Sequence, residues 1–236
     1  MGPNLSAMSP DSAAASSAVE NYLKVIYSLG ERDSAPVTTS RLAKRLGVAP
    51  SSVSGMLRRL VELGLAEHRR YGQVTLTAAG TAAALQVLRR HRLLEMYLVA
   101  ELGYTWDEVH DDAEVLEHGV SERLLARMDA KLEHPTVDPH GDPIPSAEGR
   151  IAAVAAARLS TLAPGARGPL VRVDDTDPAV LRHLSEHGIA LGQSVELLAR
   201  RPFDGPFVAR VGDHEHDLAP QLAAALWIGG AVDRLG

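Results

Sequence analysis

The chain has 236 residues, of which 45% are apolar, 23% charged and 4% aromatic, and this length allows one to three domains with buried cores. Because it contains no cysteine, disulfides, thiolate metal sites and cysteine nucleophiles are excluded. Its apolar runs are far shorter than the ~18–20 residues of a membrane-spanning helix, and residues 1–18 lack the pattern of a secretory signal, so we expect a cytoplasmic protein with no membrane segment.

The net charge of −6 is unevenly distributed along the chain. Residues 1–90 hold eleven Lys and Arg against six Asp and Glu, whereas residues 91–236 hold thirteen against twenty-four. A basic first third joined to an acidic remainder indicates an anion-binding module attached to a part that binds cations or contacts a partner. Chance segregation of surface charge is the alternative, and only motifs can decide between the two.

Hydrophobic periodicity and capping signals predict three helices in the basic part. Apolar residues recur at helical spacing over residues 17–30. A short helix is then expected between an N-cap among Thr38, Thr39 and Ser40 and a stop at Gly47, and another from Pro50 to Gly64. Two short helices joined by a tight turn form a helix-turn-helix.

A β-hairpin is predicted directly after these helices. Residues 65–68 and 73–77 flank a basic turn at 69–72, and the second of these segments alternates in polarity. A hairpin in this position is the wing of a winged helix, so residues 17–80 are predicted to be a DNA-binding domain. Residues 1–16 are rich in Ser, Ala and Pro and are expected to form a flexible leader.

Long amphipathic helices are predicted after the wing. One covers residues 77–102 and is followed by Gly103, and another covers 105–120 and continues, or is capped again, over 121–132. Such helices beside a small winged domain are the natural material for a dimer interface. We therefore expect a helical dimerisation domain over residues 81–148 and a homodimer.

The pattern changes in the last part of the chain. Residues 135–148 contain four prolines, which predicts a turn-rich domain boundary. A linker is expected over 149–168, in which residues 150–162 are either a helix or a tether. Residues 169–236 contain short β-like segments and one predicted helix at 178–187. A second helix is a candidate at 220–227. Expected strands lie at 170–173, 194–198, 207–211 and 216–218.

Together these segments predict a mainly α protein with three parts. An N-terminal winged helix-turn-helix precedes a helical dimerisation domain, and a C-terminal small SH3-like β-barrel domain follows.

The predicted recognition helix carries polar residues at its N-terminus and basic residues around it. Hydroxyls and backbone amides there are expected to face the major groove and the phosphates. The residues expected at this end of the helix are Ala49, Pro50, Ser51, Ser52 and Ser54. The residues expected to neutralise phosphates are Arg41, Lys44, Arg45, Arg58, Arg59, Arg69 and Arg70. An ordinary solvated basic face, or a winged helix that contacts protein, is the alternative.

Histidines and carboxylates recur at helical spacing in the acidic part. Two neighbouring predicted helices each carry such residues on one face. They are His91, Glu95, His110, Glu114, Glu117 and His118. Imidazole and carboxylate without sulfur suit divalent iron or manganese, and also accept cobalt or zinc in vitro. The alternative is a network of salt bridges with no metal.

The motifs disfavour three other classes of function: an enzyme, a sensor of an organic ligand and a scaffold that does not bind DNA. The chain lacks a HExxH zinc-protease motif, a GxSxG elbow and a phosphate-binding loop, and an enzyme would leave the winged helix unexplained, so no catalytic residue is expected. A winged-helix regulator that senses an organic ligand predicts no metal response. An interaction scaffold without DNA affinity is disfavoured by the basic wing.

Six stretches of the chain form a specific joint pattern. They are VENYLKVIYSL, APSSVSGMLRRLVELGL, YGQVTLTAAG, RRHRLLEMYL, WDEVHDDAEVLEHGVSERL and DPHGDPIP. Together they resemble the diphtheria-toxin-repressor family of metal-dependent repressors, strongly over residues 17–145 and weakly over the C-terminal part. The pattern looks most like the manganese-responsive regulators of actinobacteria. This resemblance implies a homodimer that binds double-stranded DNA at palindromic operators when loaded with metal and represses metal-uptake genes.

The resemblance also implies two metal sites. The residues that match the family's ancillary site are His91, Glu95 and His110. Those that match its primary, activating site are Asn21, Glu114, Glu117 and His118. Iron sensors of the family have Cys at the position of Glu114, whereas manganese sensors have Glu, and this harder ligand favours Mn(II) over the alternative, Fe(II).

Two residues depart from the family pattern. Asn21 stands where iron sensors have Met and manganese sensors have Asp; its amide oxygen can coordinate but carries no charge. Lys24 replaces an acidic ligand of the two-domain manganese regulators.

Further candidate ligands are Glu20 in the first helix and, in the C-terminal domain, Asp174, Asp175 and Asp177. Metal at the primary site would tie the first helix to the dimerisation core and fix the spacing of the recognition helices.

Overall fold

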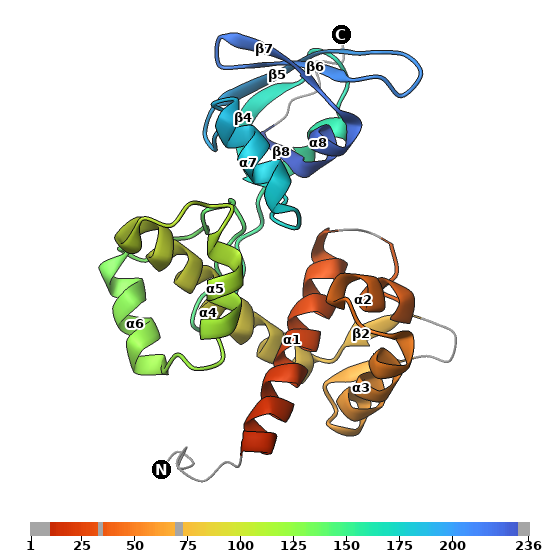
Figure 1. Cartoon of the computed structure of the whole chain (residues 1–236), viewed down its shortest axis with the longest axis vertical. Coiled ribbons are helices and arrows are strands. Elements are labelled where there is room, and N and C mark those ends of the chain that lie inside the picture. The colour runs from red at the N-terminus through yellow and green to blue at the C-terminus, as the bar shows by residue number, and fades with distance from the viewer. Residues whose placement is uncertain (1–9, 33–34, 69–72, 231–236) are drawn as a thin grey trace. The chain divides into compact units, whose positions relative to one another are not determined.

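The computed structural model describes residues 10–32, 35–68 and 73–230 (Figure 1). It divides into two compact units, one of Met1–Arg90 with Pro145–Arg150 and one of His91–Ile144 with Ile151–Gly236. Within the described residues, no helix is long and apolar enough to cross a membrane.

The first unit contains the winged helix. Three helices precede a two-stranded antiparallel hairpin in which Ala66 pairs with Leu76 and His68 with Val74. Leu42, Leu57 and Leu60 are fully buried in its core, and each contributes about 1.5–3 kcal/mol by leaving water. The elements are α1 (Pro10–Arg32), α2 (Thr39–Leu46), α3 (Pro50–Glu62), β1 (Ala66–His68) and β2 (Val74–Leu76).

The helix signals read from the sequence are confirmed in α2 and α3. The Thr38 side chain accepts a hydrogen bond from the backbone N–H of Arg41, and Gly47 ends α2 in the left-handed conformation with φ of 66°. Pro50 occupies the first turn of α3, where its missing N–H has no helical partner to lose.

The start of α1 differs from the sequence prediction. The helix begins at Pro10 rather than at Ser17, so residues 10–16, which were expected in the leader, are helical. This stretch contains three consecutive alanines, and alanine has the highest helix propensity, although it adds no large apolar residue to a periodic stripe. The remainder of the expected leader, residues 1–9, lies outside the described residues.

A close backbone contact joins the wing to the next helix, α4 (Ala78–Leu102). Thr77 caps this helix, accepting a hydrogen bond from the N–H of Gly80 at 3.1 Å and donating one to the carbonyl of Gly64 at 2.7 Å. A Cβ atom at Gly80 would lie 1.9 Å from the carbonyl oxygen of Leu65. Glycine is therefore required where α4 begins.

Helix α4 begins in the first unit and ends in the second. The second unit continues with α5 (Val109–Leu116) and α6 (Glu122–Lys131), the latter capped by Ser121 as expected. Helix α5 is shorter than the predicted 105–120, because residues 106–108 and 117–119 form turns. Buried apolar residues hold these helices together: Leu93, Leu94, Leu98, Val109, Ala113 and Leu125.

The proline-rich segment 135–148, expected as a domain boundary, contains a change of unit between Ile144 and Pro145, and its first part, residues 135–144, is a packed loop of the second unit. Asp138, His140 and Asp142 are buried, and the backbone N–H of Val173 in strand β4 (Arg167–Val173) donates to the carbonyl of His140 at 2.9 Å. Gly141 has φ of +86°, and a Cβ atom there would lie 2.0 Å from the carbonyl oxygen of Val171. The loop thus contacts the C-terminal sheet directly.

The C-terminal sheet has six strands among the described residues, in the order β3-β8-β4-β5-β6-β7. Strands β3 and β7 are its edges, so the SH3-like domain is an open sheet and not a closed barrel. Leucines of α7 and α8 pack against its core. The strands are β3 (Ala156–Arg158), β4 (Arg167–Val173), β5 (Ser194–Arg200), β6 (Phe207–Val211), β7 (His214–Leu218) and β8 (Leu226–Gly229). The helices are the 3-10 turn η2 (Leu159–Thr161), α7 (Pro178–Glu186) and α8 (Pro220–Ala225).

Two segments of this domain differ from the sequence prediction. The expected linker 149–168 contains β3, η2 and the start of β4, so the sheet begins earlier than residue 169. The candidate helix over 220–227 is confirmed as α8 over 220–225, whereas its last two residues begin strand β8. All four residues of β8 are buried, and a strand covered on both faces shows no alternation in its sequence.

Candidate metal centre and DNA-binding surface

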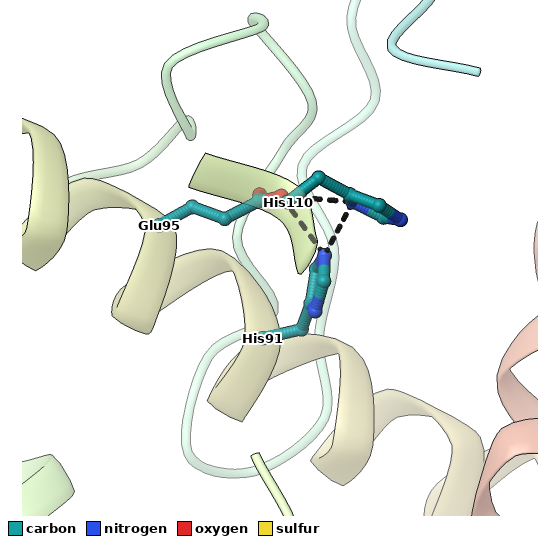
Figure 2. Close-up of side chains that lie close together, drawn as sticks. All are labelled: His91, Glu95 and His110. Carbon is teal, nitrogen blue, oxygen red and sulfur yellow. Dashed lines mark hydrogen bonds and ion pairs between the residues drawn. The ribbon is translucent and has the colours of Figure 1, made fainter. Parts of the chain in front are cut away.

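Three of the predicted ligands, His91 and Glu95 of α4 and His110 of α5, converge in the second unit (Figure 2). Each offers a ligand atom within 4.8 Å of the others. His91 Nε2 lies 2.9 Å from Glu95 Oε1 and 3.2 Å from His110 Nδ1, and His110 Nδ1 lies 3.2 Å from Glu95 Oε1. The sequence therefore predicted a cluster that the fold assembles from two helices.

Glu95 is the most buried member of this cluster. Its side chain is fully inaccessible, and burial alone would raise its pKa. The opposing attraction of His91, with hydrogen bonds from His110 and His91 and the nearby His140, outweighs burial and holds the pKa of Glu95 well below its usual range. A carboxylate kept ionised in the interior is a ready cation ligand.

A second group of donors shares Glu95. Glu95, His140 and Asp175 also have ligand atoms within 4.8 Å of one another, with His140 Nδ1 3.9 Å from Glu95 Oε2. These two atoms are buried and have no hydrogen-bond partner among the described residues. Buried polar atoms without partners are uncommon in native structures, and a cation would satisfy both.

The sequence reasoning missed His140. It lies in the stretch DPHGDPIP, one of the six that carry the family resemblance, where no helical spacing links it to the other ligands. Its Nε2 lies 2.6 Å from the carbonyl oxygen of Trp106; because a carbonyl only accepts, Nε2 carries the proton and Nδ1 is turned toward Glu95. Burial lowers the pKa of His140, but Glu95, Asp138 and Asp175 outweigh it and raise the pKa above its ordinary value.

The three candidate metal ligands of the C-terminal domain differ in their partners. Only Asp175 joins the donors around Glu95. Asp174 accepts a hydrogen bond from the backbone N–H of Thr176 at 3.0 Å, which forms a local turn. Asp177 caps α7, accepting from the N–H of Ala179 at 2.9 Å. Asp174 and Asp177 therefore have structural partners, and Asp175 is the candidate that the fold favours.

The loop that carries His140 is anchored by buried charges. Arg92 contacts Asp138 at 3.5 Å and Asp142 at 3.6 Å, and donates to the carbonyl of Pro143 at 2.6 Å. Arg172 of β4 lies 2.5 Å from Asp142. Burial, with Asp142 and Glu95 nearby, raises the pKa of Asp138 to about 8. Removing one partner of a buried ion pair strongly destabilises a protein. These contacts therefore fix the position of the loop and of His140.

The predicted primary ligands are divided between the two units. Glu114, Glu117 and His118 lie at the end of α5 in the second unit, and Asn21 lies on α1 in the first. Glu117 is fully buried, and its Oε2 lies 2.6 Å from Nδ1 of His91. Its Oε1 lies 3.6 Å from Nε2 of His118. Glu117 thus connects the predicted primary set to the cluster around Glu95.

Glu20 is engaged within the first unit. Its Oε1 lies 2.9 Å from Nη2 of Arg90, in a part-buried ion pair between α1 and α4. This contact gives Glu20 a structural partner, whereas its role as a metal ligand remains a prediction.

The N-terminus of α3 is exposed, as a recognition helix requires. Val53, Leu57 and Leu60 form its buried face. The predicted DNA contacts at its N-terminus and along its surface are all exposed: Ala49, Pro50, Ser51, Ser52, Ser54, Arg58 and Arg59. Among these, Ser54 donates its hydroxyl to the carbonyl of Pro50 at 3.0 Å, a local bond that competes with base contacts.

The remaining basic candidates differ in their surroundings. Lys44 and Arg45 are exposed at the end of α2. Arg41 donates Nη1 to the carbonyls of Ala35 and Pro36 at 2.6 and 3.0 Å, so its guanidinium also holds the preceding loop. Arg69 and Arg70, predicted at the tip of the wing, lie outside the described residues.

Comparison with known families matches three segments of the chain. Residues 15–74 match the model "Iron dependent repressor, N-terminal DNA binding domain", and residues 77–146 match "Iron dependent repressor, metal binding and dimerisation domain". Residues 157–229 match the FeoA domain. The matches confirm the predicted fold class.

Individual relatives cover most of the chain. The iron-dependent repressor IdeR of Mycobacterium leprae (strain TN) is 35% identical over 77% of this chain and 76% of its own. A manganese-dependent transcriptional repressor in complex with manganese is 46% identical, covers 91% of this chain and 100% of its own, and has a TM-score of 0.86. The manganese regulator SloR is 31% identical over 89% and 97%, with a TM-score of 0.76.

The fold and these matches define a metal-dependent, DNA-binding regulator and not an enzyme. The chain belongs to the diphtheria-toxin-repressor family of iron- and manganese-dependent transcriptional repressors. The resemblance noted in the sequence is thereby confirmed.

Proposed function

We propose that this repressor is activated by Mn(II), binds a palindromic DNA operator as a homodimer in the cytoplasm, and controls genes of metal uptake and homeostasis. The observation that carries the proposal is the buried donor set around Glu95, which contains only imidazole nitrogens and carboxylate oxygens. Sulfur ligands from cysteine are excluded because the chain has none.

The choice of manganese rests on ligand hardness. Carboxylates suit Mn(II), whereas softer ligands shift the preference toward other metals. Glu114 supplies a carboxylate at the position where the family's iron sensors have Cys. Similarity to a manganese-dependent repressor at 46% identity supports this choice, and Fe(II) is the second candidate because IdeR, an iron-dependent repressor, is 35% identical.

Two sites are proposed, with different donors. The ancillary site would use His91, Glu95 and His110, with His140 and Asp175 as further ligands that complete the buried group. The two buried atoms without hydrogen-bond partners, Glu95 Oε2 and His140 Nδ1, support this assignment. Co(II) or Zn(II) would substitute at these donors in vitro.

The primary site would act as the switch. Its proposed ligands are Asn21, Glu114, Glu117 and His118. Because Asn21 belongs to one unit and the others belong to the second, metal at these residues would restrain the winged helix relative to the dimerisation helices. Such a restraint would fix the spacing of the two recognition helices in a dimer, which must match half-sites a whole number of DNA turns apart.

The proposed dimer interface lies on the helices of the second unit. Val115 is 76% exposed, and Leu116 and Leu124 are 45% and 46% exposed. Large apolar side chains left in contact with water on α5 and α6 are typical of a surface that a second copy covers.

The test is fluorescence anisotropy under anaerobic conditions with a labelled duplex selected from random DNA by the protein itself. Affinity is measured in chelator, in Mn(II) and in Fe(II) at one salt concentration, because phosphate contacts make affinity depend on salt. We expect tight binding with Mn(II), weaker binding with Fe(II) and none in chelator.

A variant pair links the metal response to the assigned residues. Glu114→Gln is expected to lose the response to Mn(II), whereas Asp111→Asn, which removes an exposed carboxylate from the same helix, is expected to keep it. Stronger activation by Fe(II) would keep the family mechanism and overturn manganese as the activator. Binding that is indifferent to chelator would overturn the metal switch.

A further inference from the structure

Four of the ten histidines lie on or beside two elements of the C-terminal domain, and none of them is among the residues assigned above. His183 lies on α7 and His187, four residues further on, is the cap at its end, whereas His214 and His216 are two residues apart on β7. Residues at the first spacing share a helix face, and residues at the second share a strand face. The fold therefore brings two pairs of imidazoles toward one another.

The helical pair is already arranged as a donor group. His183, Glu186 and His187 are exposed, and each offers a ligand atom within 4.8 Å of the others. The two imidazole rings have centroids 4.1 Å apart. Neighbouring imidazoles at this distance repel each other when both are protonated. When both are neutral, their ring nitrogens can bind one shared cation.

One hydrogen bond prepares His187 as a ligand. Its Nδ1 lies 2.8 Å from the backbone carbonyl oxygen of His183. A carbonyl oxygen only accepts, so Nδ1 carries the proton and the neutral ring keeps a lone pair on Nε2. A histidine that donates its other ring nitrogen to a carbonyl is the usual arrangement at protein metal sites, because it fixes the tautomer and the ring orientation.

Strand β7 supplies a third imidazole. The ring of His216 is half-buried and lies 6.4 Å from the ring of His187, in an edge-to-face arrangement. Rotation of the His216 side chain would turn its ring toward an ion held by Nε2 of His187. Three imidazole nitrogens with the carboxylate of Glu186 then make four ligands, the number and type found in tetrahedral zinc sites.

We propose that His183, Glu186, His187 and His216 form a surface site for an imidazole-preferring divalent metal, of which Zn²⁺ is the representative, on the C-terminal domain. The proposed site has three imidazoles and one carboxylate, whereas the cluster around Glu95 with His140 and Asp175 has three imidazoles and two carboxylates, and the two share no residue. Imidazole-rich sites bind Zn²⁺ far better than Mn²⁺. The site would connect α7 to β7, so zinc bound there would stabilise the domain by mass action.

The test uses the full chain and Zn²⁺ itself. Equilibrium dialysis gives the number of Zn²⁺ ions bound per chain for the unaltered protein, for the double variant His183→Gln/His187→Gln, and for His134→Gln. His134 is an exposed histidine on a different element, so its variant controls for the loss of any surface imidazole. We expect the double variant to bind one Zn²⁺ fewer than both of the others.

Two further measurements separate ligand loss from misfolding. The thermal midpoint in chelator and the Mn(II)-dependent affinity for DNA are expected to be unchanged in the double variant, because both of its altered side chains are exposed. His216→Gln is expected to weaken the same zinc site at least about tenfold. Equal zinc stoichiometry in the double variant and the unaltered protein would overturn the proposal, and so would a His216→Gln variant with unchanged zinc affinity.

Discussion

The two predicted metal sites are built in different ways. The ancillary set, His91, Glu95 and His110, comes from neighbouring helices of one unit, and its atoms lie 2.9–3.2 Å apart. The primary set combines Asn21 of the first unit with residues at the end of α5 in the second. The first set is therefore assembled by the packing of a single unit, whereas the residues predicted for the second set belong to both units.

This difference predicts different roles for the two sites. A site whose ligands are already in place binds metal without reorganising the protein, so metal binding there changes the rest of the structure little. A site whose ligands lie on separate units couples metal binding to the arrangement of those units, and such coupling is reciprocal: DNA must tighten metal binding by the factor by which metal tightens DNA binding. Glu117, which lies 2.6 Å from His91, joins the two sites.

The largest effect is expected from removing a primary ligand. Glu117→Gln and His118→Ala should each lower the affinity for DNA in Mn(II) to the value measured in chelator. We expect a loss of about 10- to 100-fold, because typical coupling free energies between two binding sites correspond to factors of this size. Anisotropy measures this loss, and analytical ultracentrifugation should show the same dimer as before. Intact metal-dependent affinity in both variants would contradict the assignment of the site.

The next effect concerns the loop that carries His140. Gly141→Ala places a side chain 2.0 Å from the carbonyl oxygen of Val171 and forces alanine into a left-handed conformation, so we expect it to destabilise the second unit by about 1–3 kcal/mol. Gly212→Ala is the matched control, because Gly212 also has positive φ but no atom within 4 Å of a Cβ. Urea unfolding compares the two, and equal losses would show that the close approach to β4 is unimportant.

A smaller effect on DNA binding is expected at the ancillary site. His110→Gln should remove one metal ion per subunit, measured by dialysis against Mn(II), and should weaken activated DNA binding by less than Glu117→Gln does. The reason is that His110 belongs to the preassembled set within one unit. If His110→Gln abolished activation as completely as Glu117→Gln, the distinction between the two sites would fail.

The smallest specific effect is expected from the recognition helix. Arg58→Gln should lower DNA affinity equally for all sequences and should reduce the slope of log K against log salt by about 1, as one phosphate contact is lost. Arg123→Gln, an exposed arginine on α6, should leave the slope unchanged. An unaltered slope for Arg58→Gln would remove this residue from the DNA-binding surface.

Local signals in the sequence were sufficient for much of the fold. Thr38 and Gly47 define the ends of α2, Pro50 begins α3, and Ser121 begins α6, because each of these preferences depends on backbone conformation and hydrogen bonding within a few residues. Helical spacing likewise predicted that His91 and Glu95 share one face of α4. These features require no knowledge of the rest of the chain.

Other features depend on what packs against them. Strand β8 is buried in the sheet, so it lacks the alternation that identifies half-buried strands. The loop at 138–142 contains a proline and a glycine typical of an exposed turn, but Arg92 and Arg172 hold its carboxylates in the interior. Burial of this kind arises from residues distant in sequence.

The sequence by itself therefore determined the family, the winged helix and the helical spacing of the main ligands, since local periodicity and caps encode them. Only the tertiary structure decided that Asp175, and not Asp174 or Asp177, joins Glu95 and that His140 completes the group. It also brought His183 and His187 of α7 close to His216 of β7. The physical reason is that a metal site depends on distances of a few ångströms between side chains from separate elements, and these distances are set by packing.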